Sequence, residues 1–153
     1  SNFEENVGTV MPGSRLQHNL SLSHCNNVEL VGGRFDASPN GSGIALDHCD
    51  QVTMTSNEIA RNGYYGLLIM ESSNVSAMGN LVEANDRSGI MVEYLRKGSE
   101  KITIQDNKVQ YNNGYGVESY AARNSKISGN RYTGNGNNAA QEKISTEKYI
   151  LMD

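Results

Sequence analysis

A six-residue phrase recurs along the middle of this chain. Its copies begin at Asn57, Asn80, Asn107 and Asn130, and so they start 23, 27 and 23 residues apart. Each copy has an apolar or aromatic residue two positions after its first Asn and a second Asn five positions after it. In three copies a Gly follows the second Asn at a distance of four residues. A tandem period in the low twenties is typical of a solenoid, in which each repeat builds one turn.

The same period continues towards the N-terminus. Residues 20–30 align with residues 44–54, and both segments carry a His-Cys pair, with His24 and His48 one period apart. We therefore expect coils to begin near five aligned positions, with a partial coil before the first. These positions are Val28, Val52, Val75, Ile102 and Ser125.

Apolar and polar residues alternate within each coil, as in Val52, Met54 and then Ile59. Alternation with period two, interrupted by Gly and Asn, indicates short β-strands that meet at corners, and the 3.6-residue spacing of a helix is absent. The sequence predicts an all-β fold, a right-handed parallel β-helix solenoid of about five to six coils with 23–27-residue repeats. We expect the aligned Asn side chains to hydrogen-bond from coil to coil in ladders, which makes them structural residues.

Three segments are expected. Residues 1–18 are predicted to form an N-terminal arm or cap, residues 19–140 the parallel β-helix, and residues 141–153 a C-terminal strand or cap. Caps are expected because a bare solenoid end exposes strand edges and apolar side chains. Since the chain starts at Ser1 without Met or an apolar leader, we expect a short module or a fragment of a larger protein.

The coil that begins at Val75 is four residues longer than its neighbours, and the extra length falls at residues 94–100. Insertions in solenoids form loops on one face, which is often the binding face. Tyr94 supplies a ring that could stack on a sugar, and Arg96 and Lys97 make the loop charged. A merely solvated loop is the alternative.

Charge and composition exclude several classes of function. The formal net charge of −4, from 13 basic and 17 acidic residues, argues against nucleic acid and anionic membranes as partners. No apolar run is long enough to span a bilayer. Cys25 and Cys49 are one coil apart and are expected to stack as free thiols. No zinc-like spacing or calcium loop is present, so the sequence requires no cofactor, although Ca²⁺ remains possible.

Chemistry is expected on the outward-facing positions of the coils. Because neighbouring strands lie about 4.8 Å apart, residues in equivalent positions should gather on one wall. The expected wall contains Asp47, His48, Glu71, Glu93 and Tyr94. An imidazole, several carboxylates and a phenol together can perform general acid–base catalysis. The alternative is an ordinary solvated sheet face.

Arg87 is expected at the corner that leads into this wall, where it could bind a sugar carboxylate through two hydrogen bonds. Tyr64, Tyr65 and Tyr115 occupy nearby corner positions. Their rings would suit stacking on a glycan.

The coils resemble the right-handed β-helix modules of polysaccharide-acting proteins, above all the catalytic module of bacterial alginate (mannuronan) epimerases. Residues 83–90, Glu-Ala-Asn-Asp-Arg-Ser-Gly-Ile, are similar to that family's Ala-Asn-Asp-Arg-His-Gly-Phe. The resemblance gives Arg87 the family's arginine role, while Ser88 stands where the family has His. Asp47 and His48 are similar to part of the family's Asp-Pro-His-Glu motif. The family's active-site Tyr and Asp are replaced by Ser42 and Met70.

Two interpretations of function follow from these residues. The first is an epimerase or β-eliminating lyase acting on a uronate polymer, with Arg87 neutralising the carboxylate. His48 or a neighbouring Tyr would take the proton, oriented by Asp47 or Glu71. The second is a non-catalytic glycan-binding or structural β-helix, such as a segment of a phage tailspike or of a surface protein. The tailspike version predicts a homotrimer. The expected partner is an acidic polysaccharide, and the expected location is secreted, cell-surface or virion-associated.

Overall fold

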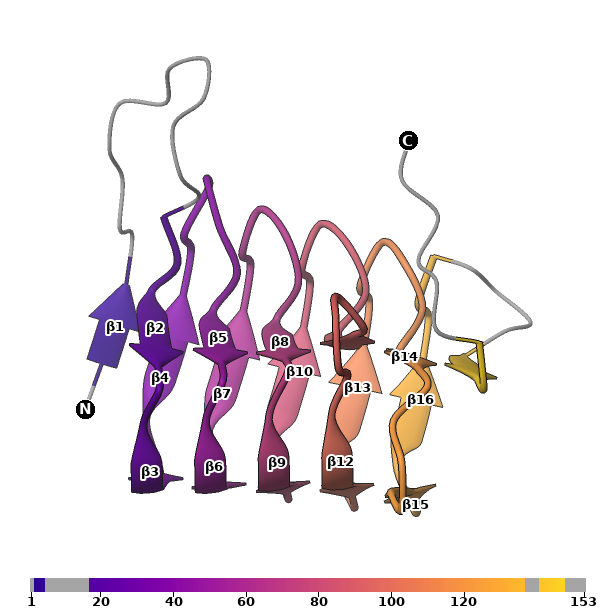
Figure 1. The fold of residues 1–153 in the computed structure, drawn as a ribbon. Coiled ribbons are helices and arrows are strands. Elements are labelled where there is room, and N and C mark those ends of the chain that lie inside the picture. The colour runs from indigo at the N-terminus through magenta and orange to yellow at the C-terminus, as the bar shows by residue number, and fades with distance from the viewer. Residues whose placement is uncertain (1, 5–16, 137–140, 148–153) are drawn as a thin grey trace.

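In the computed structural model the chain winds as a parallel β-helix, in which successive coils add one strand to each of three sheets (Figure 1). The structure describes residues 2–4, 17–136 and 141–147. Every regular element among these residues is a strand, and the strand pairs are parallel. The predicted all-β solenoid is thereby confirmed. Within these residues there is no helix that could span a bilayer.

The strands are only three to six residues long. Sheet A contains β1 (Asn2–Glu4), β4 (Arg34–Asp36), β7 (Glu58–Ala60), β10 (Leu81–Glu83), β13 (Lys108–Gln110) and β16 (Arg131–Thr133). Sheet B contains β2 (Leu20–Ser23), β5 (Ile44–Asp47), β8 (Leu67–Met70), β11 (Ile90–Glu93), β14 (Val117–Tyr120) and β17 (Glu142–Ser145). Sheet C contains β3 (Asn26–Val31), β6 (Asp50–Thr55), β9 (Ser73–Met78), β12 (Glu100–Gln105) and β15 (Lys126–Ser128).

The interior is filled by the inward-facing residues of the three sheets. Val52 pairs with Val75, and Val75 with Ile102, which confirms the predicted alignment of these coils. Val52 and Ile59 are fully buried, as the alternation predicted. Burial of aliphatic side chains in stacked layers supplies the main stabilisation of such a solenoid.

Two Asn ladders run along the corners. In the first, the side-chain amide of Asn57 donates to Asn80 Oδ1 at 3.1 Å and to the backbone carbonyl of Leu30 at 2.9 Å. In the second, the side-chain amide of Asn85 donates to Asn112 Oδ1 at 2.8 Å. Asn85 Oδ1 in turn accepts a hydrogen bond from the side-chain amide of Asn62 at 3.0 Å. The predicted coil-to-coil ladders are therefore present.

The Gly that follows three of the phrases is explained by a close approach to the second ladder. A Cβ on Gly66 would lie 2.7 Å from the side-chain nitrogen of Asn85 and 2.7 Å from the backbone oxygen of Gly89. A side chain does not fit there without moving the ladder. The repeated Gly therefore positions the chain as it enters sheet B.

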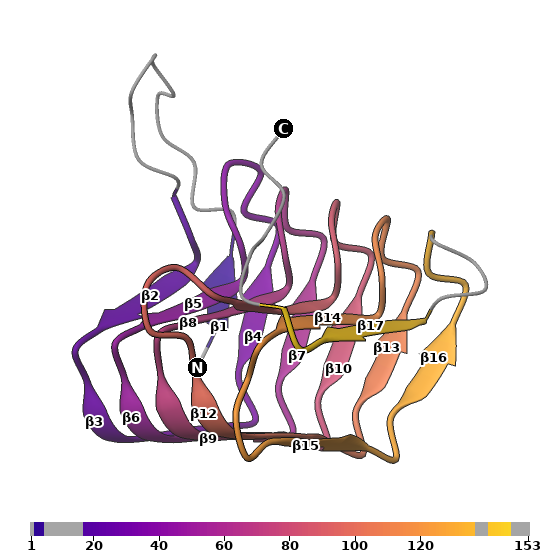
Figure 2. The same ribbon diagram turned by 45° about the vertical axis from the view of Figure 1, so that its right-hand side comes forward.

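The predicted arm or cap at residues 1–18 lies mostly outside the described residues. Of the predicted C-terminal strand or cap, residues 142–145 form β17, and residues 148–153 lie outside the described residues. The four-residue insertion forms a loop between β11 and β12, which projects from the corner that joins sheets B and C (Figure 2).

Candidate functional site

The outward side of sheet B carries an apolar strip. Leu68 pairs with Ala45 on one side and with Met91 on the other, and all three are buried. The full outward cluster consists of Ala45, Leu68, Met91, Tyr65, Met70, Tyr94 and Tyr120. In the neighbouring row Met70 separates Asp47 from Glu93. Met70 thus interrupts the expected wall between Asp47 and Glu93, each of which is the last residue of its strand. Polar side chains form two sets around the strip, one before the strands of sheet B begin and one where they end.

The first polar group lies at the corner that leads into sheet B. The backbone N–H of Arg87 donates to the Tyr64 carbonyl at 3.0 Å, which places the two residues in adjacent coils at the same corner. The Arg87 guanidinium consequently stacks over the Tyr64 ring, 4.3 Å from its centroid, and lies 5.9 Å from the centroid of Tyr65. Arg87 is exposed, so its guanidinium remains accessible to a ligand.

Glu118 links this corner to the sheet. Its carboxylate accepts a hydrogen bond from the Ser88 hydroxyl at 2.7 Å and another from the Tyr120 hydroxyl. The Ser88 hydroxyl also accepts the backbone N–H of Tyr115 at 3.0 Å. Lys143 Nζ lies 5.9 Å from the Tyr115 centroid and 5.6 Å from the Tyr120 centroid. A carboxylate, a hydroxyl, two phenols and an ammonium group are thus brought together beside Arg87.

The titratable groups of this corner influence one another. Burial raises the pKa of Glu93, and the charge of Glu118 raises it further, while Arg87 acts in the opposite direction. Burial likewise raises the pKa of Tyr65, whereas its hydrogen bond with Arg87 lowers it. Glu93 therefore stays protonated to a higher pH than an exposed glutamate would.

Tyr120 is held as a neutral phenol. Burial raises its pKa, and both the hydrogen bond with Glu118 and the negative charge of that carboxylate raise it further. A phenolate at this position would lie beside a carboxylate with little water to solvate it. The Tyr120 hydroxyl can therefore donate a hydrogen bond or a proton, but it is poorly suited to act as a base.

An open groove of about 310 Å³ lies beside Arg87. Its lining consists of Tyr65, Asp86, Arg87, Ser88, Asn113, Gly114, Tyr115 and Glu118. Aromatic faces stack on the C–H faces of sugars, and a guanidinium binds a carboxylate through two parallel hydrogen bonds. The groove therefore combines the two kinds of contact that an acidic sugar requires.

The second polar group follows sheet B. His48 Nδ1 lies 2.6 Å from Asp47 Oδ1, and the His48 ring stacks on His24 with 4.8 Å between centroids. The predicted Asp47–His48 pair thus forms at the end of β5, whereas Arg87 precedes the start of β11. Neither residue of the pair lines the Arg87 groove.

Glu71 organises the insertion loop. Its carboxylate accepts the backbone N–H groups of Arg96 and Lys97, each at 2.8 Å, and that of Leu95 at 3.4 Å, together with that of Gly98. Burial opposes ionisation of Glu71, but these hydrogen bonds outweigh it and lower the pKa of the carboxyl. The Glu71 oxygens, which would have to orient a catalytic base, thus already accept hydrogen bonds from the loop backbone.

The predicted substrate-binding residues divide between the two groups. Those that lie around Arg87 are Tyr64, Tyr65 and Glu93. Those that belong to the loop are Tyr94, Arg96 and Lys97. Among the described residues, no three His, Cys, Asp or Glu side chains come together as a metal site.

Sequence reasoning missed two charged members of the groove corner. They are Glu118 in β14 and Lys143 in β17, which occupy partner positions in these two adjacent strands. A signal was present, because Glu118 stands in the row that the preceding coils fill with Leu68 and Met91. Glu118 marks the coil at which this outward row changes from apolar to charged.

In a search of solved structures, the A-module of the mannuronan C-5 epimerase AlgE6 from Azotobacter vinelandii matches with a TM-score of 0.41 and 12% identity. The match covers 89% of this chain and 58% of that module. No curated protein sequence matches. The sequence matches the family of the right handed beta helix region over residues 5–147, and the chain belongs to this family.

Proposed function

We propose that the protein binds an acidic polysaccharide, built of uronate residues, in the groove beside Arg87. The observation that carries the proposal is the stacking of an exposed guanidinium on Tyr64 at 4.3 Å. A sugar carboxylate would pair with the guanidinium, while the rings of Tyr65 and Tyr115 offer apolar faces to the pyranose. Lys143 adds a second cation at the same corner.

Titration with polymannuronate, polyguluronate and polygalacturonate, with dextran as the neutral polymer, tests the proposal. Loss of charge-assisted hydrogen bonds is expected to weaken uronate binding by roughly tenfold to a hundredfold in Arg87→Ala. Arg131→Ala, which removes an exposed arginine from sheet A, is the matched control and should bind as the wild type does. Equal binding by the two variants, or equal binding of dextran, would contradict the proposal.

A second candidate function is proton transfer on the bound uronate, as an epimerase or a β-eliminating lyase. It is favoured by the hydrogen bond between Tyr120 and Glu118, which places a neutral phenol beside a carboxylate near Arg87. In such a reaction a base removes the proton next to the sugar carboxylate, and Arg87 stabilises the developing negative charge. Glu118 would serve as base and Tyr120 as acid, with His48, oriented by Asp47, as the alternative base.

Two assays separate catalysis from binding alone. Lyase action creates unsaturated chain ends that absorb in the ultraviolet, and epimerisation changes the anomeric proton spectrum of the polymer. Loss of activity with retained binding in Tyr120→Phe and Glu118→Gln would identify the groove pair, and the same result in His48→Ala would identify the histidine. A protein that binds uronate polymers and changes none of them is a non-catalytic glycan-binding β-helix.

A further inference from the structure

The groove beside Arg87 crosses three successive coils. Tyr65, Ser88 and Tyr115 hold equivalent positions in these coils, since each directly precedes the repeated Gly that leads into sheet B. All three line the groove, and the backbone N–H of Tyr115 donates to the Ser88 hydroxyl at 3.0 Å. Along the solenoid axis the groove therefore presents an aromatic ring, a hydroxyl group and a second aromatic ring.

Arg87 is the cation beside the first ring. Its guanidinium stacks at 4.3 Å on Tyr64, which directly precedes Tyr65 in the same coil. In the next coil the equivalent position is Gly114, whose backbone N–H donates to the Arg87 carbonyl at 3.1 Å. Gly114 has no side chain that could cover the guanidinium from that side. The guanidinium is therefore supported by the earlier coil and left open by the later one.

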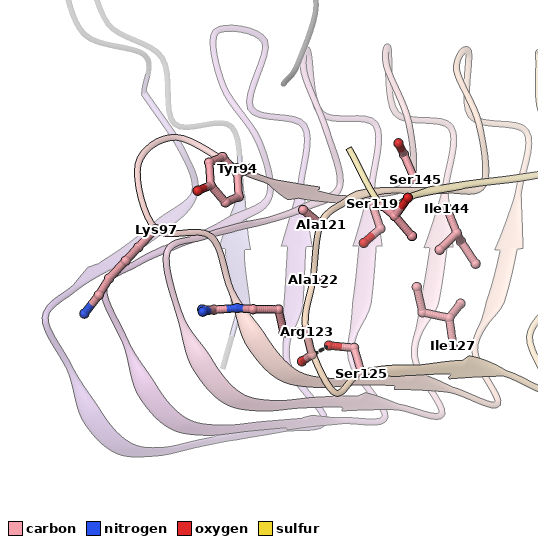
Figure 3. Close-up of a pocket in the computed structure, with 11 residues that line it drawn as sticks. Tyr94, Lys97, Ser119, Ala121, Ala122, Arg123, Ser125, Ile127, Ile144 and Ser145 are labelled. Atoms are coloured by element: carbon pink, nitrogen blue, oxygen red, sulfur yellow. Dashed lines mark hydrogen bonds between the residues drawn. The ribbon is translucent and has the colours of Figure 1, made fainter. Parts of the chain in front are cut away.

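Lys143 is the cation beside the second ring. Its neighbour in β17, Ile144, lines a cavity of about 490 Å³ at the end of the core, where Figure 3 shows it next to Ile127. Because neighbouring side chains of a strand point to opposite faces, Lys143 points outward. Its Nζ lies 5.9 Å from the Tyr115 centroid and 5.6 Å from the Tyr120 centroid. Lys143 is exposed, and within the described part of the chain no ion pair engages it.

The two cations stand beside rings that are two coils apart. Arg87 stacks on Tyr64, and Lys143 lies over Tyr115, which belongs to the second coil after that of Tyr64. Because neighbouring strands lie about 4.8 Å apart, the two sets of cation and ring are separated by about 9.6 Å along the solenoid axis. Two linked pyranose residues extend a polysaccharide by about this length. A chain that lies along the groove could therefore place the carboxylates of its first and third residues at Arg87 and Lys143.

The level between the two cations carries hydrogen-bond acceptors. Ser88 lies at this level, and Glu118, which also lines the groove, accepts its hydroxyl at 2.7 Å. The Tyr120 hydroxyl donates to the other oxygen of Glu118. Since a carboxylate has about four lone-pair sites, Glu118 can accept further hydrogen bonds from a ligand. A sugar hydroxyl or an amide N–H fits this level, whereas a third carboxylate would be repelled by Glu118.

We propose that the groove recognises two carboxylates on the first and third residues of a polysaccharide, with a neutral sugar between them. Arg87 binds the first carboxylate, Lys143 binds the second, and Glu118 accepts hydrogen bonds from the neutral sugar. The ligand class is therefore a polymer in which uronate alternates with a neutral sugar. This inference rests on the proposed function and deepens it, because the proposed function requires only Arg87, whereas the alternating ligand requires Lys143 as well.

The test compares two trisaccharides derived from hyaluronan, in which glucuronate alternates with N-acetylglucosamine. One carries glucuronate at both ends, and the other carries it only in the middle. Titration calorimetry at fixed salt should show about three- to tenfold tighter binding of the first, because it alone can reach both cations. Lys143→Ala should remove this difference and leave the affinity for the second trisaccharide unchanged, whereas Arg87→Ala should weaken the binding of both. Lys126→Ala, which removes an exposed lysine of β15 in sheet C, is the matched control and should bind both as the wild type does.

Three results would overturn this inference. The first is equal affinity of the wild type for the two trisaccharides, and the second is a Lys143→Ala variant that binds both more weakly by the same factor. The third is a mannuronate trimer that binds more tightly than the trisaccharide with glucuronate at both ends, because the middle position would then accept a carboxylate. Each of these results leaves the proposed function intact if binding of uronate polymers still depends on Arg87. If Arg87→Ala changes the binding of neither the trisaccharides nor the polymers, the proposed function fails and this inference fails with it.

Discussion

The guanidinium of Arg87 lies 4.3 Å from the centroid of the Tyr64 ring, one coil earlier in the solenoid. The two residues are 23 positions apart in the sequence, and the backbone hydrogen bond between them fixes their register. The ring supports one face of the guanidinium and leaves its edge for a ligand. An arginine supported in this way has lost part of its rotamer freedom before it binds.

Replacement of Tyr64 is expected to weaken polymer binding without unfolding the protein. Since an exposed cation–π contact contributes about 0.5–1 kcal/mol, Tyr64→Ala should bind uronate polymers about two- to fivefold more weakly. Tyr64→Phe keeps the ring and should bind as the wild type does. Isothermal titration with one polymer at fixed salt measures both variants. A Phe variant as weak as the Ala variant would show that the hydroxyl, and not the ring face, matters.

The coils could be predicted because their signals are periodic and local. Alternation identified Val52 and Ile59 as interior residues, and the spacing of the Asn phrase identified the partners in each ladder, such as Asn57 and Asn80. Each repeat makes the same contacts with its neighbours, so one correct alignment predicts all of the sheets.

The outward face could not be predicted in the same detail. Alternation distinguishes inside from outside, but Leu68 and Met91 face outward and are nevertheless buried. The hydrogen bond from Ser88 to Glu118 joins residues 30 positions apart, in a coil lengthened by the insertion. The four loop amides that bind Glu71 belong to that insertion, which has no counterpart in the other coils. Departures from the repeat are where the sequence pattern carries least information and where the candidate site lies.

Removal of one ladder member should destabilise the fold strongly. In Asn85→Ala the buried backbone N–H of Asn62 loses its acceptor at 3.0 Å, and Asn112 Oδ1 loses a donor. Leaving such buried groups unsatisfied is expected to lower the free energy of unfolding by about 2–4 kcal/mol. Asn113→Ala, an exposed asparagine in the same region, is the matched control and should change it by less than about 0.5 kcal/mol. Urea unfolding of both variants measures the difference, and similar values would contradict a structural role for the ladder.

The loop should depend on the charge of Glu71. In Glu71→Gln the backbone N–H groups of Arg96 and Lys97 lose a charged acceptor, and their hydrogen exchange should accelerate roughly five- to tenfold. Because the folded-state pKa of Glu71 is lowered, protection should be complete above the ordinary glutamate range and be lost only as pH falls through the lower folded-state pKa. Glu100→Gln, at the base of the loop, should leave both amides protected. Unchanged hydrogen exchange in Glu71→Gln would show that the loop is ordered without the charge of Glu71.

Uronate binding in the groove should strengthen as pH falls towards the raised pKa of Glu93. Above that pKa the ionised carboxylate repels the ligand and competes for Arg87, and below it the carboxyl is neutral. Glu93→Gln should therefore bind more tightly at neutral pH, by about three- to tenfold, and show a flatter pH profile. Glu29→Gln, which changes an exposed residue of β3 in sheet C, should retain the wild-type pH profile of binding. A wild-type profile in Glu93→Gln would place the titrating group elsewhere.

His18 should make the stability of the N-terminal end depend on pH. Its Nδ1 accepts the backbone N–H of Ser42 at 2.8 Å, which requires a neutral ring, and burial lowers the pKa of the imidazole. The unfolded chain therefore binds a proton at a higher pH than the folded chain does. The stabilisation should be complete above about pH 6.5 and should fall, by at most about 1.4 kcal/mol per pH unit, as pH decreases towards the lowered folded-state pKa.

Urea unfolding at several pH values, in wild type and in His18→Gln, measures this dependence as a difference. The variant should lack the part of the pH dependence that lies just below pH 6.5, because glutamine does not titrate there. His24→Gln removes an exposed histidine of the next turn and should keep the wild-type curve. If His18→Gln and the wild type lose stability in parallel, protonation of His18 does not control the acid sensitivity and a different group does.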